Sequence, residues 1–450
     1  MGLLYFDMLI LAPQAMFFLQ TVTHGPVIQT DHVQRAHAQS LIMRVELDTP
    51  GGALPFMLQV HSDNDDVFKR HDVDDRIIWC WREAVIVNGV ERISVMVGGG
   101  SQSSPSAGGI QFPEYDSSLS GHGVKGSKDL HTPLEYMHTG IWKKVRGGKT
   151  VSIQYSMKEA DSINDRFDPI ADAAEPAEFS GRWSVDFESS DELAIGTFTV
   201  DADQIASGTF LTTTGDYRYL AGRVDGPYMR LSTFDGAHAF LFHAEMQDDG
   251  SIKGDFWSGN WHHETWTAVR DDNATLPDAF EQTTITNEQA LEELVFKDTE
   301  GNPTRVLDAL DATKAKARVL EIFGTWCPNC ADASRELVSL KEKYGDDLGV
   351  VGLAFEVTED FARSSQQVQR HHAHIGSDWE VLIAGISDKA KATETLGFLD
   401  RVRSYPTLVF LNSDNEVQAV YSGFSGPATG DAYAAQRDRI EAIIDKMIDE

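Results

Sequence analysis

The feature that most constrains this chain is a pair of cysteines, Cys327 and Cys330, placed directly after the apolar run 319–323. The run predicts a buried strand, and the pattern from Cys327 to Tyr344 predicts a helix that begins at the first cysteine. Helical spacing puts Cys330 one turn after Cys327, close enough for a short disulfide. A strand that leads into C-x-x-C at the start of a helix is typical of a redox-active cysteine pair.

The first cysteine of the pair is the expected nucleophile. At a helix N-terminus, free backbone N–H groups and the positive end of the helix dipole favour a negative charge. Such placement lowers a thiol pKa from about 8.5 towards about 3.5 to 7.5. Pro328 suits the first helical position because its missing N–H would have no partner there. We therefore expect Cys327 to react as a thiolate.

Half of a zinc site is the alternative interpretation of this pair, since zinc needs further Cys or His ligands. The chain has three cysteines and no second C-x-x-C. His371, His372 and His374 could complete such a site, but their predicted helix is rich in Gln and Arg, so we expect a solvated helical face. Cys80 lies in the apolar run IIWCW and is expected to be buried and inert. We expect neither a metal ion nor an organic cofactor.

Length and charge exclude other classes of protein. A chain of 450 residues predicts two or three domains. Its formal net charge of -32 repels phosphate backbones and anionic lipid headgroups, so nucleic acid is not an expected partner. Three cysteines are too few for a scaffold stapled by disulfides.

The N-terminal segment has a short apolar stretch from Met8 to Leu19 that Pro13 interrupts. It is shorter than the roughly 20 apolar residues that span a bilayer, and no Lys or Arg precedes it as in a secretory signal. We interpret residues 1–38 as an N-terminal arm or a degraded export segment. Membrane association stays open.

Residues 39–270 show short alternating strands separated by glycine-rich turns, without a sustained helical period. This pattern predicts an all-β region at 39–175 and an all-β run of hairpins at 176–270. Such hairpins favour an antiparallel sandwich or an up-and-down barrel. Within the first region, Asn88-Gly89 predicts a tight hairpin turn, and the Gly- and Ser-rich segment 99–109 predicts a flexible loop.

The second β region suggests another function, as a module that binds a ligand or a partner, with the redox domain as its accessory. Clustered side chains that could line a ligand mouth or a metal site are Trp257, Trp261, Trp266, His262, His263 and Glu264. Residues of these types more often form barrel core and rim. A similarity to calycin-type barrels rests on Gly181-Arg182-Trp183 alone.

The composition changes at residues 271–285, which are rich in Asp, Asn, Thr and Pro and are expected to form a linker. After this segment, predicted strands alternate with predicted helices. The alternation indicates a small α/β domain with a mixed sheet at 286–450. Its predicted strands are 317–324, 349–355, 379–384, 407–411 and 417–421, and its predicted helices are 327–344, 360–374 and 431–448.

This C-terminal part, about residues 286–450, resembles the TlpA-like family of thioredoxin-fold thiol-disulfide oxidoreductases. The matching pieces are GTWCPNC at 324–330, the strand 350–355, and SYPT at 404–407 leading into LVFL at 408–411. The resemblance implies that Cys327 attacks and that Cys330 resolves. It also implies that Pro406 is a cis-proline beside the pair, where the preceding backbone receives a substrate strand.

Two acids are candidate proton shuttles. Glu321 lies six residues before Cys327, where the similar thioredoxins carry a buried acid. Burial there would raise its pKa and let it take a proton from Cys330. Glu356 stands near the end of the next strand, where members of the resembling family carry an acid, and an exposed ion pair is its alternative role. The residues expected to contact the substrate are Trp326, Pro328, Tyr405 and Pro406.

These features predict a thiol-disulfide oxidoreductase, expected to be a reductant, that forms a mixed disulfide with a protein partner. A second thiol-disulfide protein would supply its electrons. The resemblance implies a periplasmic or cell-envelope location, with the cytoplasm as the alternative. A thiol peroxidase of the same fold is the nearest rival, but its pattern has Thr or Ser three residues before the peroxidatic cysteine, and Thr325 stands two before Cys327.

Overall fold

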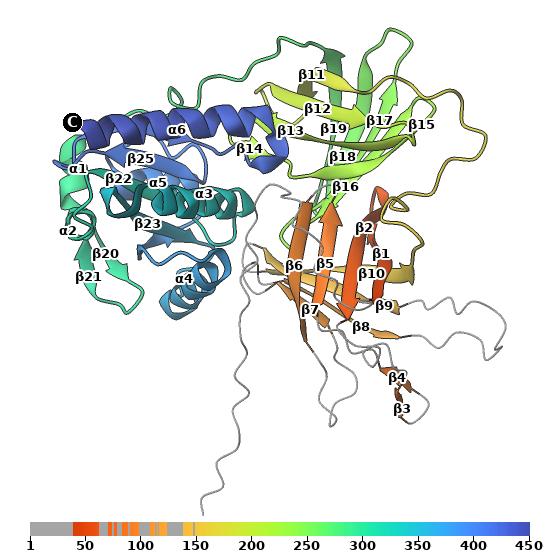
Figure 1. Ribbon diagram of the computed structural model, residues 1–450, viewed down its shortest axis with the longest axis horizontal. Coiled ribbons are helices and arrows are strands. Elements are labelled where there is room, and N and C mark those ends of the chain that lie inside the picture. The colour runs from red at the N-terminus through yellow and green to blue at the C-terminus, as the bar shows by residue number, and fades with distance from the viewer. Residues whose placement is uncertain are drawn as a thin grey trace, which may run out of the picture. The chain divides into compact units, whose positions relative to one another are not determined.

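The computed structural model describes residues 39–62, 71–73, 76–78, 83–88, 91–98, 109–112, 115, 117–123, 138–146 and 149–450 (Figure 1). The expected arm at 1–38, Cys80 and residues 99–108 of the loop predicted at 99–109 lie outside these residues, and Gly109 begins a strand. β5 and β6 pair antiparallel with Asn88 opposite Glu91, as the predicted hairpin requires, and the Asn88 amide donates to the Phe234 carbonyl. The two intervening residues, 89 and 90, also lie outside the described residues.

The first β region is a closed antiparallel barrel with the order β1-β10-β9-β8-β7-β6-β5-β2, in which β1 also pairs with β2. The up-and-down barrel is therefore the form found here, and the sandwich is not. A separate two-stranded sheet pairs β3 with β4. The strands are β1 Gln39–Thr49, β2 Gly52–Ser62, β3 His71–Val73, β4 Arg76–Ile78, β5 Glu83–Asn88, β6 Glu91–Gly98, β7 Gly109–Phe112, β8 Ser117–Gly123, β9 His138–Arg146 and β10 Lys149–Glu159.

The second β region is a nine-stranded antiparallel sheet, β12-β11-β19-β18-β17-β16-β15-β13-β14, which a further pairing of β12 with β13 closes into a second barrel. Aromatic side chains fill its core; Phe210 and Phe242, for example, stack with ring centroids 4.7 Å apart. The strands are β11 Gly181–Phe187, β12 Ala194–Val200, β13 Ile205–Thr212, β14 Gly215–Asp216, β15 Leu220–Asp225, β16 Tyr228–Phe234, β17 Ala239–Met246, β18 Ile252–Ser258 and β19 His262–Arg270.

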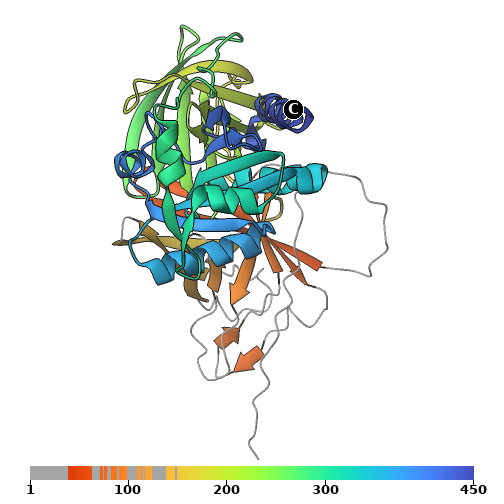
Figure 2. The same cartoon turned by 90° about the vertical axis from the view of Figure 1, so that its left-hand side faces the viewer.

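The C-terminal part is a seven-stranded mixed sheet, β21-β20-β24-β23-β22-β25-β26, with the thioredoxin arrangement at its centre. There β22 runs parallel to β23 and antiparallel to β25. Figure 2, in which this part faces the viewer, shows the helices packed against the sheet. The strands are β20 Val295–Asp298, β21 Pro303–Arg305, β22 Ala317–Phe323, β23 Leu348–Glu356, β24 Glu380–Ile386, β25 Thr407–Leu411 and β26 Val417–Ser422.

Helices cover the continuous apolar strands of this sheet. Every residue of β22 and of β23 is buried, as expected for strands covered on both faces. Tyr344 of α3 donates to Asp445 of α6 at 2.8 Å, and Arg335 of α3 contacts His374 of α4, so α3 lies between α4 and α6. The helices are α1 Glu288–Glu293, α2 Val306–Ala312, α3 Pro328–Tyr344, α4 Phe361–Ile375, α5 Lys389–Leu396 and α6 Asp431–Asp449, with 3-10 turns η2 Gly345–Asp347 and η3 Pro427–Thr429. Within the described residues, none of these helices is long and apolar enough to cross a membrane.

Candidate functional site

The two cysteines lie where β22 passes into α3. Cys327 is the N-cap residue of α3, in extended backbone conformation, and Pro328 is the first helical residue. The backbone N–H of Cys330 donates to Sγ of Cys327 at 3.2 Å. Cys327 is 7% exposed and Cys330 is fully buried, and both are free thiols. The start of α3 therefore places a backbone N–H donor at Sγ of Cys327, and the Cys330 thiol lies fully buried next to it.

The buried thiol is held in its protonated form. Burial raises the pKa of Cys330 well above its usual value, and the Cys327 sulfur beside it acts in the same direction. Negative charge at Glu321 adds to this effect, whereas a backbone hydrogen bond at Gly324 opposes it. Cys330 therefore needs a nearby base before it can act as a nucleophile.

Sγ of Cys327 also contacts the loop before β25. The thiol of Cys327 lies 3.5 Å from the carbonyl oxygen of Tyr405, and the peptide bond between Tyr405 and Pro406 is cis. The hydroxyl of Ser404 donates to the Pro406 carbonyl at 3.2 Å, and this hydrogen bond within the loop stabilises its conformation. The chain thus places a backbone carbonyl beside Sγ of Cys327.

The expected substrate contacts differ in their exposure. Pro328, Tyr405 and Pro406 are buried, and Trp326 is partly exposed. The Trp326 indole N–H donates to the Phe355 carbonyl at 2.9 Å, and its ring meets the Tyr405 ring edge-on at 5.7 Å between centroids. Trp326 is therefore the member of this set that a substrate can reach most directly.

Glu321 lies fully buried in β22. Burial raises its pKa to about 8, and a hydrogen bond from Ser334 opposes that rise. Ser334 Oγ donates to Oε1 of Glu321 at 2.6 Å, while Oε2 has no hydrogen-bond partner. A carboxyl group with one unpaired buried oxygen and a pKa near neutrality has the properties of a proton acceptor.

Glu356 is also buried, with 1% of its surface exposed, so the exposed ion pair considered above is wrong. Its carboxylate accepts the backbone N–H of Thr325 and the Thr325 hydroxyl, both at 2.9 Å. Burial raises its pKa, and the two Thr325 hydrogen bonds lower it. Glu356 therefore fixes the position of the loop that connects β22 to Cys327.

The predicted solvated face is wrong for His371, which is 2% exposed. Its Nε2 lies 3.3 Å from Ser334 Oγ, and burial lowers its pKa well below the usual value. Helix composition did not reveal which face of α4 meets α3. His372 is partly buried and His374 is exposed. Among the described residues, no group of three or more His, Cys, Asp or Glu side chains could hold a metal ion.

The tryptophans of the second barrel serve in packing. Trp266 is 2% exposed within the core of that barrel, and Trp257 and Trp261 pack against the apolar core of the first. His262 bonds Glu264 at 2.9 Å and His263 bonds Asp255 at 2.8 Å. These clustered side chains therefore have packing or hydrogen-bond partners within the protein.

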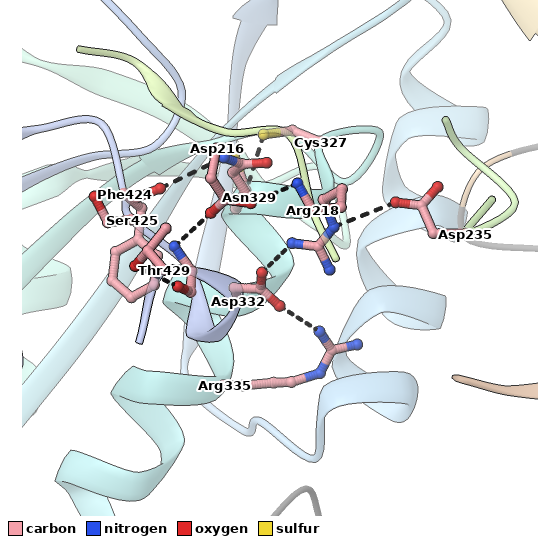
Figure 3. Close-up of polar contacts among 12 residues, drawn as sticks. Asp216, Arg218, Asp235, Cys327, Asn329, Asp332, Arg335, Phe424, Ser425 and Thr429 are labelled. Carbon is pink, nitrogen blue, oxygen red and sulfur yellow. Dashed lines mark hydrogen bonds and ion pairs between the residues drawn. The ribbon is translucent and has the colours of Figure 1, made fainter. Parts of the chain in front are cut away.

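Two features of the site had no signal in the sequence. Ser334 joins Glu321 to His371 and is not predicted by any motif around it. A turn of the second barrel, residues 213–218, contacts Asn329 within C-P-N-C and the loop 423–426 after β26 (Figure 3). Such contacts join residues more than a hundred positions apart, and a single sequence does not indicate them.

Comparison with known proteins gives neighbours in structure alone. No protein-family model and no curated protein matches the chain. A thioredoxin-family thiol:disulfide interchange protein from Chlorobium tepidum TLS aligns at 16% identity over 34% of this chain and 92% of its own, with a TM-score of 0.25. A DsbF homologue from Corynebacterium diphtheriae aligns at 18% identity over 40% and 97%, with a TM-score of 0.27. The exposed lipoprotein thioredoxin Etrx1 of Streptococcus pneumoniae strain TIGR4 aligns at 21% identity over 32% and 98%, with a TM-score of 0.22.

The strand order and the site together define the C-terminal part as a thioredoxin-fold domain that carries a C-x-x-C dithiol. The aligned structures are thioredoxin-fold proteins at low identity and cover between 32% and 40% of this chain. The function proposed next therefore depends on the geometry around Cys327 and Cys330.

Proposed function

We propose that the protein is a thiol-disulfide oxidoreductase that reduces disulfides through Cys327 and Cys330. The observation that carries this proposal is the 3.2 Å hydrogen bond from the Cys330 N–H to the Cys327 sulfur at the N-cap of α3. A backbone donor and the helix dipole both stabilise negative charge on that sulfur. A second thiol one helical turn away supplies the resolving group.

The proposed reaction has two exchange steps. The Cys327 thiolate attacks one sulfur of a substrate disulfide, so a Cys327–substrate disulfide forms and the other substrate sulfur leaves as a thiolate. Cys330 then loses its proton and attacks Sγ of Cys327, which releases the second substrate thiolate. The Cys327–Cys330 disulfide that results holds the oxidising equivalents. The substrate gains two electrons, and a reduced thiol-disulfide partner protein restores the dithiol.

Glu321 is the proposed acceptor of the Cys330 proton. Its carboxyl group is buried with one oxygen unpaired, and its pKa of about 8 keeps the basic form accessible near neutral pH. Glu356, the second candidate, uses both carboxylate oxygens on Thr325. We therefore propose that Glu321 moves the proton and that Glu356 positions the loop that presents Cys327.

Protein disulfides are the proposed substrates, and the cell envelope, which the family resemblance implies, is the proposed location. The carbonyl of Tyr405 beside Cys327 supports the first point, because a backbone carbonyl at this position can also accept a hydrogen bond from an extended substrate segment. Cell fractionation tests the location, and recovery of the native protein with cytoplasmic markers would contradict it.

Insulin reduction with dithiothreitol as electron donor tests the proposed function. Wild type should accelerate precipitation of the insulin B chain, and Cys327→Ser should reduce the rate to the uncatalysed level. Met96→Leu, a substitution in the first barrel, serves as a control for expression and handling. Equal rates for wild type and Cys327→Ser would contradict the proposal.

A further inference from the structure

The second barrel contacts three segments of the C-terminal part through residues 213–218, which lie between β13 and β15, include the short strand β14, and are called the 213–218 turn below. Gly215 of this turn lies so close to Asn329 that a Cβ on the glycine would clash with Nδ2. Asn329 in turn donates to the Phe424 carbonyl at 3.4 Å. A Cβ on Gly423 would meet the Thr213 carbonyl at 2.9 Å. The turn therefore packs directly against the Asn329 side of the C-x-x-C segment.

Polar contacts fix the turn in this position (Figure 3). The Gly426 N–H donates to Oδ2 of Asp216 at 2.6 Å, and the Arg218 N–H donates to Oδ1 of the same carboxylate at 2.7 Å. The Arg218 guanidinium pairs with Asp332 of α3 and lies 3.4 Å from Asp235. The side chains of these three residues are 7%, 6% and 3% exposed. Removal of one partner from an ion pair buried to this degree lowers stability, because the other charge stays buried without its partner.

A second contact fixes the loop before the cis-proline. Arg403, two residues before Tyr405, donates to the Thr213 hydroxyl at 2.9 Å and pairs with Glu192 of the second barrel. The same turn therefore contacts the chain on two sides of Cys327. Trp326, which is partly exposed, contacts Phe355 and Tyr405 within the C-terminal part.

We propose that the 213–218 turn is a specificity element that covers the Asn329 side of Cys327 and selects small or extended disulfides over folded ones. This inference rests on the proposed function. A small disulfide reaches the sulfur past Trp326 while the turn stays in place. A disulfide within a folded protein needs a wider approach, so it reacts when the Arg218–Asp332 pair opens and the turn moves away. The apparent rate for the folded substrate is then reduced by the fraction of molecules that are closed.

The test compares two substrates on the full-length, reduced protein: 2,2′-dipyridyl disulfide, which is small and uncharged, and insulin. The opening variant is Arg218→Ala, which leaves Asp332 paired with Arg335 and Asp235 paired with His238. Asp332→Asn weakens the same ion pair from the opposite partner and keeps the side-chain volume. Arg223→Ala, which removes an ion pair with Asp225 inside the second barrel, is the matched control.

Arg218→Ala and Asp332→Asn should each raise the insulin rate at least about fivefold and leave the dipyridyl disulfide rate within about twofold of wild type. Arg223→Ala should change neither rate. Insulin rates within twofold of wild type in both opening variants, or equal increases with both substrates, would overturn the proposal. A rapid dipyridyl disulfide phase that is present in wild type and lost in Cys327→Ser tests the proposed function separately, because that reaction does not require the turn to open.

Discussion

Ser334 Oγ donates a 2.6 Å hydrogen bond to Oε1 of Glu321, a carboxyl group with no exposed surface. Burial raises the pKa of Glu321 to about 8, and the Ser334 hydrogen bond acts in the opposite direction because it stabilises the carboxylate. The two residues together set the pH range in which the Glu321 carboxyl loses its proton and can act as a base.

Glu321→Gln should change how stability depends on pH. In wild type the folded protein keeps a proton at Glu321 that the unfolded chain loses above the ordinary carboxyl pKa of 4.5. The resulting destabilisation is absent below pH 4.5, grows by about 1.4 kcal/mol per pH unit up to about pH 8, and is constant above it. The variant lacks this titration, so it should gain stability relative to wild type as pH rises through this window.

Urea unfolding of both proteins at several pH values measures this difference. Glu359→Gln, which replaces an exposed acid, is the matched control and should follow wild type. Parallel curves for wild type and Glu321→Gln would show that Glu321 does not titrate in this range.

Ser334→Ala should move the pH profile of the resolving step to higher pH. Loss of the hydroxyl removes the hydrogen bond that lowers the pKa of Glu321, so the basic form appears at a higher pH. Stability should also fall by about 1 to 3 kcal/mol, because Glu321 Oε1 and His371 Nε2 lose a buried partner. The measurement is the rate at which Cys330 releases a preformed mixed disulfide, as a function of pH.

Ser334→Thr keeps the hydroxyl and should restore the wild-type pH profile. If Ser334→Ala lowers stability but leaves the pH profile of the resolving step unchanged, Ser334 has a structural role alone.

Glu356→Ala should slow disulfide exchange and destabilise the protein by about 1 to 3 kcal/mol. Both carboxylate oxygens accept hydrogen bonds from Thr325, and removal of them leaves a buried backbone N–H unpaired. Glu356→Gln should retain most activity, since its amide oxygen can accept the N–H and its amide nitrogen can donate to the hydroxyl. Insulin reduction and thermal unfolding of the two variants check this, and equal losses in both would show that the negative charge itself is needed.

The parts of the site that the sequence predicts are those that depend on local pattern. The apolar run before Cys327 becomes the buried strand β22, Cys327 becomes the N-cap of α3, and the alternation of β22 places Glu321 inside. Regular turns likewise predicted the hairpins of the second barrel. In each case the pattern lies within a few residues along the chain, where periodicity and turn chemistry act directly.

The features that the sequence does not predict depend on contacts between distant segments. β8 reads SSLSGHG, which lacks strong alternation, and it forms because β7 and β9 pair with it in a closed barrel. His371 is buried because α4 packs against α3, which its polar neighbours do not indicate. Arg218 and Asp332 form an ion pair across 114 positions, and each looks like an ordinary surface residue in its own segment.

The central claim is that the sulfur at the head of α3 attacks and the buried sulfur resolves. Reduced Cys330→Ser protein, mixed with insulin, tests it most directly, because the variant can attack a disulfide but cannot release the product. Peptide mass spectrometry should find an insulin chain linked to Cys327, and the same mixture with Cys327→Ser should yield no adduct at Cys330. An adduct at Cys330 in Cys327→Ser, together with none at Cys327 in Cys330→Ser, would contradict the account.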